Sequence, residues 1–192
     1  MIDYLLAVQT EMRRVLETGD SPELRIRWVR SAQFHLTLLF LGSVPATEVL
    51  EFKVLAEQAI SSFDRLPSLV LQGTGCFPAF HRPRVLWVGC RPNQELEKLQ
   101  AHFFETFSPR VGLTKNDGSY PHVTIARCRH LPRKYAERIQ RLSKENPFDE
   151  CAWLVNSVSL MQSLTGPSGP EYACLSNFFP PTRPGSPEAR PE

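Results

Sequence analysis

The sequence contains no long apolar run. It has no stretch of about 20 apolar residues, so no membrane-spanning helix is predicted. The apolar stretch near the N-terminus is interrupted by Gln9, by Glu11 and by an arginine pair, and no small-residue cleavage site follows it. A signal peptide is therefore not predicted either. We expect a cytoplasmic protein without a membrane partner.

Paired cysteines are also missing. The cysteines occur singly, and none forms the C-x-x-C pair that zinc ribbons and redox dithiols use: Cys76, Cys90, Cys128, Cys151 and Cys174. Scattered thiols in odd number are typical of a reducing compartment. A chain of 192 residues buries roughly 70% of its unfolded surface, so it needs no disulfide or metal to fold.

Neither sign of charge is in excess. Lysine and arginine number 22 against 20 acidic residues, which gives a net charge of +2 and no global field that would indicate a partner. A nucleic-acid surface would have to be a local patch. Two short basic groups are candidates, although such groups are more often solvated faces. They are His81 with Arg82 and Arg84, and Arg25 with Arg27 and Arg30.

Hydrophobic periodicity predicts an α+β fold. Apolar residues at helical spacing predict a helix that ends before Gly19 and further helices over residues 45–62, 93–107 and 133–144. β-rich runs predict strands over residues 24–29, 34–42, 69–77, 84–90, 122–129, 153–164 and 171–179. The first two strands are expected to pair or to be neighbours. Residues 180–192 are proline-rich and are expected to form a disordered tail.

Each half of the chain contains one His-x-Thr motif on a predicted strand. The motifs are His35 with Thr37 and His122 with Thr124, and the two halves resemble a pseudo-repeat. Side chains alternate along a strand, so the histidine and the threonine of each motif share a face. If both strands face one cleft, two imidazoles converge there.

Two imidazoles suit the displacement of an oxygen at phosphorus. One imidazole accepts a proton from the attacking water, and the other donates a proton to the departing alkoxide. Histidine titrates near pH 6.5, so both tasks are possible at neutral pH. Threonine hydroxyls can donate hydrogen bonds to the phosphate oxygens as negative charge develops. This arrangement requires neither a metal ion nor a cofactor.

Other interpretations of these residues have less support. A lone histidine in a strand is usually structural, but two such triplets arise by chance in only roughly 3% of chains of this composition. Zinc ligands at suitable spacing are missing around both motifs, although Cys128 lies near the second. Cys90 and Cys128 are on no recognisable nucleophile elbow. Three aromatic residues could stack bases but are more often core residues: Trp28, Phe80 and Trp87.

Arg127 has an ambiguous position. It lies three residues beyond Thr124, so on an ideal strand it shares a face with Val123 and Ile125 and points away from His122. A bulge or a twist would turn it back toward a bound phosphate. Without one, it is a surface arginine.

Four segments follow one another in a recognisable order: RWVRSAQFHLTLLFLGSV, GCFPAFHRPRVLWVGC, YPHVTIARCR and SVSLMQSLTGPSGPEYACLSNF. In order and approximate spacing they resemble the 2H phosphoesterase superfamily. Within it they resemble the RNA 2′,3′-cyclic phosphodiesterases, formerly called 2′-5′ RNA ligases. The resemblance covers nearly the whole chain. It implies a single bilobal domain over residues 1–179, in which two similar lobes, each an antiparallel sheet with outer helices, enclose a cleft lined by both motifs.

The resemblance also implies an activity. A 2′,3′-cyclic phosphate at an RNA end would be hydrolysed to a 2′-phosphate, with His35 protonating the leaving 3′ oxygen and His122 activating water. Thr37 and Thr124 would bind phosphate oxygens. The second motif of the family reads His-x-Thr-x-x-Arg, which implies a phosphate contact by Arg127. Family members also join or cleave 2′-5′ linked RNA, so weak ligase activity is implied.

One departure from the family pattern concerns the N-terminus. Family members begin with a strand of the pattern Arg-x-Phe-x-Ala-x-x-x-Pro, whereas this sequence enters a predicted helix by Asp3. Without that strand, one sheet edge would be unpaired. We expect a monomer that acts on RNA ends carrying a 2′,3′-cyclic phosphate, or on a cyclic nucleotide. Two alternatives stay open: a non-catalytic protein that binds RNA ends, and a phosphodiesterase for another small cyclic phosphate.

Overall fold

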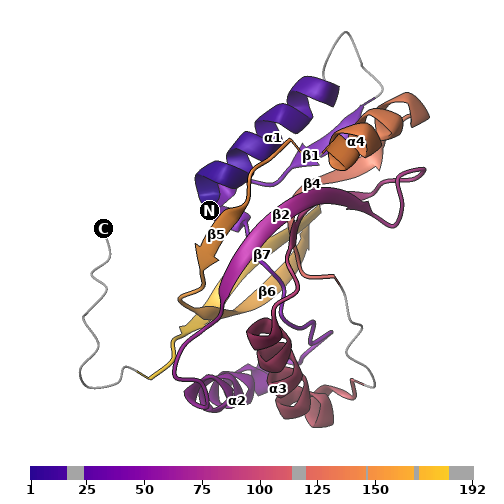
Figure 1. Cartoon of the computed structure of the whole chain (residues 1–192). Coiled ribbons are helices and arrows are strands. Elements are labelled where there is room, and N and C mark those ends of the chain that lie inside the picture. Colours follow the sequence, from indigo (N-terminus) through magenta and orange to yellow (C-terminus); the bar gives the residue numbers. More distant parts are fainter. Residues whose placement is uncertain (17–23, 114–119, 146, 167–168, 182–192) are drawn as a thin grey trace. The chain divides into compact units, whose positions relative to one another are not determined.

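The computed structural model describes residues 1–16, 24–113, 120–145, 147–166 and 169–181. Of the expected tail, residues 182–192 lie outside this range. The described residues form helices and antiparallel strands, which confirms the α+β class (Figure 1). The chain divides into two units. Unit 1 comprises Met1–Leu38, Ser68–Asn93 and Gly118–Trp153, and unit 2 comprises Leu39–Pro67, Gln94–Asp117 and Leu154–Glu192.

Unit 1 is built around a sheet that has five strands within the described residues. They are β1 (Arg25–Trp28), β2 (Ser68–Phe77), β3 (Val85–Cys90), β4 (His122–His130) and β5 (Cys151–Leu154), and their order is β1-β4-β3-β2-β5. β4 pairs antiparallel with both β1 and β3, and β2 pairs antiparallel with β3. The second His-x-Thr motif therefore lies on an interior strand.

Two helices cover one face of this sheet. Helices α1 (Ile2–Leu16) and α4 (Arg133–Glu145) lie on the same side of it (Figure 1). The Arg13 guanidinium of α1 stacks 4.6 Å from the ring centre of Trp28. Thr74 Oγ1 of β2 donates a hydrogen bond to Ser143 Oγ of α4 at 3.1 Å. We call this side the helix face and the opposite side the site face.

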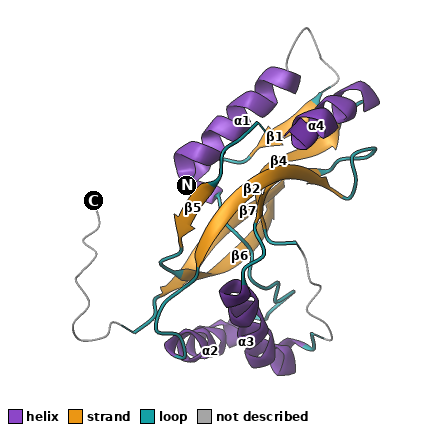
Figure 2. Cartoon of the chain, in the orientation of Figure 1, coloured by secondary structure: helices purple, strands orange, loops and turns teal. Residues whose placement is uncertain are grey.

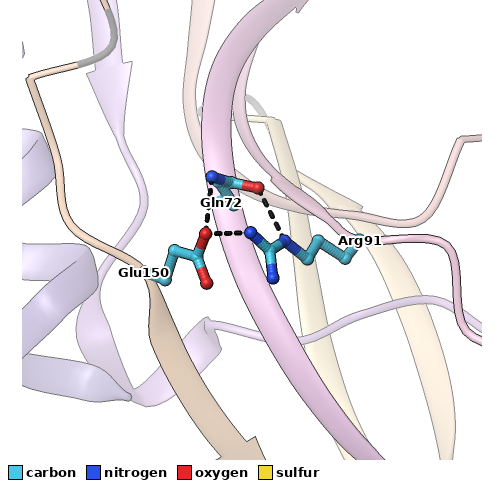
Figure 3. Close-up of polar contacts among 3 residues, drawn as sticks. All are labelled: Gln72, Arg91 and Glu150. Atoms are coloured by element: carbon cyan, nitrogen blue, oxygen red, sulfur yellow. Dashed lines mark hydrogen bonds and ion pairs between the residues drawn. The ribbon is translucent and has the colours of Figure 1, made fainter.

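A polar cluster fastens β5 to the middle of the sheet (Figure 3). Arg91 Nε donates to Gln72 Oε1 at 2.8 Å, Gln72 Nε2 donates to Glu150 Oε1 at 2.8 Å, and Arg91 also forms an ion pair with Glu150. Arg91 directly follows β3, and Glu150 directly precedes β5. Because both charged side chains are well exposed, we expect the ion pair to contribute at most about 1 kcal/mol.

Unit 2 combines helices α2 (Val49–Ser61) and α3 (Gln94–Val111) with strands β6 (Val158–Gly166) and β7 (Gly169–Phe178). The strands form an antiparallel sheet that is two-stranded in the described part of the chain. The rings of Phe52 and Phe107 pack at 5.6 Å, and Arg110 pairs with Glu51 at 2.8 Å, so α2 and α3 are joined by apolar and ionic contacts. None of the described helices in either unit combines the length and the apolar character that a membrane span requires.

Two strand predictions are wrong. Residues 34–42 form no continuous strand: Leu36 alone makes a bridge, to Val123, and the segment is drawn as loop in Figure 2. The ladder between β1 and β4 ends at Trp28, and a 3₁₀ turn at Ser31–Gln33 follows. Beyond this turn the chain pairs with β4 again at Leu36. Residues 153–164 are split between β5 and β6 at the turn formers Asn156 and Ser157.

Candidate active site

The two His-x-Thr motifs lie side by side in unit 1. Their middle residues, Leu36 and Val123, form an antiparallel bridge. In this register His35 faces Thr124 across the pair, and Thr37 faces His122. Val123 is fully buried, and strand alternation places the side chains of His122 and Thr124 on the opposite side of β4, which is the site face. The bridge thus brings the backbones of the two motifs side by side.

Both imidazoles are held by the same kind of hydrogen bond. The Nδ1 atom of His35 lies 2.8 Å from the carbonyl oxygen of Gln33, and the Nδ1 atom of His122 lies 2.8 Å from that of Tyr120. A carbonyl oxygen only accepts, so Nδ1 carries the proton and donates it in both rings. The Nε2 atom is then the one that gains or loses a proton.

The surroundings of His122 favour its neutral form. Burial lowers the pKa of this imidazole below 6.5, the hydrogen bond to Tyr120 opposes that effect, and the nearby charges of His35 and Arg127 lower the pKa further. At neutral pH, Nε2 of His122 therefore has a lone pair that can accept a proton. The electrostatic interaction also shows that His35 and Arg127 lie close to His122.

Aromatic rings supply much of this burial. The ring of Phe77 meets the imidazole of His122 edge-on at 4.9 Å between centres, and the ring of Trp87 lies 6.2 Å away. Trp87 in turn packs against Phe77 and against Tyr120, each at 5.2 Å. These rings exclude water from one side of the imidazole. Trp87 was an ambiguous candidate from sequence, and the structure places it on the site face.

Two glycines leave the space that the rings occupy. Gly75 faces Trp87 across the β2–β3 pair, and Gly89 faces His122 across the β3–β4 pair. A Cβ atom on Gly75 would lie 2.3 Å from the Trp87 ring, and one on Gly89 would lie 2.8 Å from the Tyr120 ring. Both distances are shorter than any normal contact, so a side chain at either position would displace a ring. The aromatic cluster therefore requires glycine at both positions.

A bulge in β4 turns Arg127 toward the site face. Thr124 and Ala126 pair with consecutive residues of β3, so Ile125 is an extra residue in β4. An extra residue inverts the alternation beyond it, and Ile125 and Ala126 are accordingly both fully buried. Arg127 therefore shares a face with Thr124. The expectation from an ideal strand, that Arg127 points away, is wrong, and the bulge considered as its exception is present.

Gln9 of α1 satisfies the backbone at this bulge, and the sequence analysis did not identify it. Its Nε2 atom donates to the carbonyl oxygens of Val29 and Ile125, each at 2.8 Å, and the side chain is only 4% exposed. The backbone N–H of Val29 also donates to the Ile125 carbonyl, at 2.9 Å. The available signal was a polar residue beside the apolar stripe of the first helix.

The cysteine candidates lie away from the site. Cys128 pairs with Ile26 on the helix face, and burial raises the pKa of its thiol to about 12. Burial also raises the pKa of Cys90. Thiols of this kind are scarcely ionised at neutral pH and are poor nucleophiles. Within the described residues, no group of three or more His, Cys, Asp or Glu side chains has an arrangement that could hold a metal ion.

Sequence comparisons identify relatives over most of the chain. A family model described as the 2′-5′ RNA ligase superfamily matches residues 7–167. An RNA 2′,3′-cyclic phosphodiesterase of Aquifex aeolicus is 30% identical over 155 residues, which are 80% of this chain and 81% of that protein. Another, of Thermotoga maritima, is 28% identical over 174 residues, covering 91% of this chain and 90% of that protein.

Solved structures share the fold. A crystal structure of a protein from Thermus thermophilus has a TM-score of 0.70 at 24% identity and covers 93% of this chain and 90% of that one. E. coli LigT complexed with 3′-AMP has a TM-score of 0.59 at 23% identity and covers 91% of each chain. The fold, the paired motifs and the match to the family model lead to one conclusion: the chain belongs to the 2′-5′ RNA ligase superfamily.

Proposed function

We propose that this protein hydrolyses 2′,3′-cyclic phosphate ends of RNA to 2′-phosphate ends, with His35 as general acid and His122 as general base. The observation that carries the proposal is the bridge between Leu36 and Val123, which brings the two His-x-Thr motifs side by side. The relatives named RNA 2′,3′-cyclic phosphodiesterase support the substrate.

The reaction needs one proton removed and one delivered. Nε2 of His122 accepts a proton from water as the water oxygen forms a bond to phosphorus. The bond between phosphorus and the 3′ oxygen breaks, and Nε2 of His35 donates its proton to that oxygen. The products are a 3′-hydroxyl and a 2′-phosphate, and proton exchange with solvent restores both imidazoles.

The surroundings of the two rings favour this assignment. The general base must be neutral before the reaction, and the lowered pKa of His122 provides that state at neutral pH. In both rings the bond from Nδ1 to a backbone carbonyl fixes the tautomer and leaves Nε2 for proton transfer.

Three further side chains stabilise the phosphate as its charge increases. The hydroxyls of Thr37 and Thr124 donate to non-bridging oxygens, and the guanidinium of Arg127, which the bulge turns to the site face, binds the same group. No step uses a metal ion. We also propose weak 2′-5′ ligation, in which the 5′-hydroxyl of a second RNA takes the place of water in the same displacement.

Turnover of an RNA oligonucleotide with a 2′,3′-cyclic phosphate end tests the proposal. The reaction is followed in excess chelator, and the position of the phosphate in the product is determined. We expect a 2′-phosphate from the wild type and at least about a hundredfold loss of kcat in His35→Ala and in His122→Ala. The control His102→Ala removes a histidine of α3 in unit 2 and is expected to keep wild-type activity.

Four outcomes would contradict the proposal. Full turnover by folded His122→Ala would exclude the two-imidazole mechanism, and inhibition by the chelator would exclude metal independence. Binding of the RNA end without any product would instead support a non-catalytic RNA-end-binding protein. Faster turnover of an unrelated small cyclic phosphate at equal concentration would show that the protein is a phosphodiesterase for that compound and not for RNA ends.

A further inference from the structure

The ring of Tyr120 lies beside His122 on the site face. Gly89 pairs with His122 across the β3–β4 ladder, and residues that pair directly project to the same face of a sheet. A Cβ atom on Gly89 would lie 2.8 Å from Cε1 of Tyr120 and 2.9 Å from its hydroxyl oxygen. The tyrosine ring therefore occupies the place of the side chain that Gly89 lacks, next to His122.

This ring is supported on one side and reaches solvent on another. Trp87 packs against it at 5.2 Å between ring centres, with 41° between the ring planes. The backbone beside it is fixed, because the N–H of Cys90 donates to the carbonyl of Pro121 at 3.0 Å. Tyr120 is nevertheless 45% exposed. An aromatic ring that is held from behind and presents surface to solvent is suited to stack against a planar ligand.

The position of Tyr120 indicates which part of the substrate it meets. The site-face residues along this stretch of chain are, in order, Tyr120, His122, Thr124 and Arg127. In the proposed function Thr124 and Arg127 bind the phosphate, so Tyr120 lies on the other side of His122. Alternate residues of an extended chain are about 6.5 Å apart. Only the sugar separates a nucleobase from the cyclic phosphate, so the base of the reacting nucleotide can reach a ring placed there.

We propose that Tyr120 stacks against the base of the terminal nucleotide and contributes to substrate specificity. Stacking on an aromatic ring tolerates every base, but a purine has two rings and a larger face than a pyrimidine. The protein therefore prefers RNA ends whose last base is adenine or guanine. This inference rests on the proposed function and names the residue that selects the terminal base.

Three substrates with the same reacting group test the inference. They are adenosine 2′,3′-cyclic phosphate, cytidine 2′,3′-cyclic phosphate and 1-O-methylribose 2,3-cyclic phosphate, which has no base. Steady-state kinetics compare the wild type with Tyr120→Phe, which keeps the ring, with Tyr120→Leu, which keeps apolar bulk beside Trp87, and with Tyr120→Ala. Phe63→Ala is the control, because it removes an aromatic ring from unit 2.

We expect Tyr120→Ala and Tyr120→Leu to raise KM for the adenosine substrate about tenfold with kcat unchanged, and to change KM for the base-free substrate less than about twofold. The wild type should have a lower KM for the adenosine than for the cytidine substrate. Tyr120→Phe and Phe63→Ala should resemble the wild type. The pH profile of kcat/KM for the base-free substrate should stay in place in Tyr120→Leu, because the Tyr120 backbone carbonyl holds His122.

An equal rise in KM on the base-free substrate, a shift of its pH profile, or no rise on any substrate would overturn the inference and leave the proposed function standing. Equal KM values for adenosine and cytidine in the wild type would overturn the preference for purines. If Tyr120→Ala does not fold, Tyr120→Leu decides.

Wild-type protein that turns over none of the three substrates would contradict the proposed function instead. In that case, calorimetric binding of adenosine 2′-phosphate and of 1-O-methylribose 2-phosphate tests Tyr120 independently. Tyr120→Leu must then weaken binding of the nucleotide alone, and any other result overturns the inference.

Discussion

At the scale of single residues, the two imidazoles share an anchor but differ in their neighbours. Both donate Nδ1–H to the carbonyl of the residue two positions earlier, which makes the two motifs alike in backbone geometry. His122 is packed against the rings of Phe77 and Trp87. Its burial holds the pKa of its imidazole below the ordinary value.

The burial of His122 predicts that removing its aromatic neighbour shifts the pH profile of kcat/KM. The acid limb reports protonation of the general base, and in the wild type we expect it below pH 6.5 because burial lowers the pKa of His122. Phe77→Ala admits water, which raises that pKa and moves the limb to higher pH. Activity should therefore fall more at acidic than at alkaline pH.

Phe63→Ala is the matched control, because it removes a ring that contacts His102 in unit 2. Its acid limb should coincide with that of the wild type. If the limb of Phe77→Ala also stays in place while the protein remains folded, Phe77 is not the group that desolvates His122.

The sequence was sufficient to find the motif residues but not the side on which Arg127 lies. His-x-Thr spacing is local information, and it predicts a shared face for each pair. The face of Arg127 depends on the extra residue at Ile125, which is recognised only when β4 is aligned with β3. The roles of Gln9 and Phe77 likewise depend on residues more than 40 positions away in the chain.

At the scale of elements, α1 and β4 are coupled through Gln9. We predict that Gln9→Leu lowers the free energy of unfolding by about 1–3 kcal/mol, because the half-buried carbonyl of Val29 loses a donor and the buried carbonyl of Ile125 loses one of two. Since the bulge orients Arg127, we expect KM to rise as well. Urea unfolding and steady-state kinetics measure the two effects.

Thr10→Ala provides the comparison, because Thr10 neighbours Gln9 on α1 but is exposed and bonds only within its own helix, to the Leu6 carbonyl, in the bonds described. It should change stability by less than Gln9→Leu and leave KM unaltered. A Gln9→Leu protein as stable as the wild type would mean that water replaces the lost amide.

The helices and most strands were predictable because each is encoded by its own hydrophobic period. α4 was expected over residues 133–144 and is found at Arg133–Glu145. The strand predicted over residues 34–42 did not form, because a run of leucine and phenylalanine indicates a strand only where a partner strand is available. In that segment Leu36 alone pairs with β4, and Phe40 is largely exposed.

At the scale of the whole molecule, the halves of the sequence do not correspond to the structural units. Each unit takes three separate stretches of chain, and both His-x-Thr motifs fall in unit 1. The pseudo-repeat seen in the sequence therefore does not assign one motif to each unit. Local periodicity could not reveal this, because the division depends on which strands pair.

This organisation predicts that the first part of the chain does not fold alone. A protein truncated after residue 113 keeps the entire first motif but lacks β4, which pairs with both β1 and β3. We expect no cooperative urea transition and little sheet signal in circular dichroism, whereas the full chain should show both. A cooperative transition in the truncated protein would show that β4 is dispensable for folding.

The single bridge at Leu36 has a consequence for how the site is maintained. His122, the proposed general base, lies on a long interior strand, whereas the segment that carries His35, the proposed general acid, pairs with that strand at Leu36. Local opening can therefore separate acid from base while the rest of the sheet stays intact. In the proposed mechanism, a phosphate held by both motifs binds only when the two motifs are adjacent, so substrate binding itself stabilises the arrangement that catalysis needs.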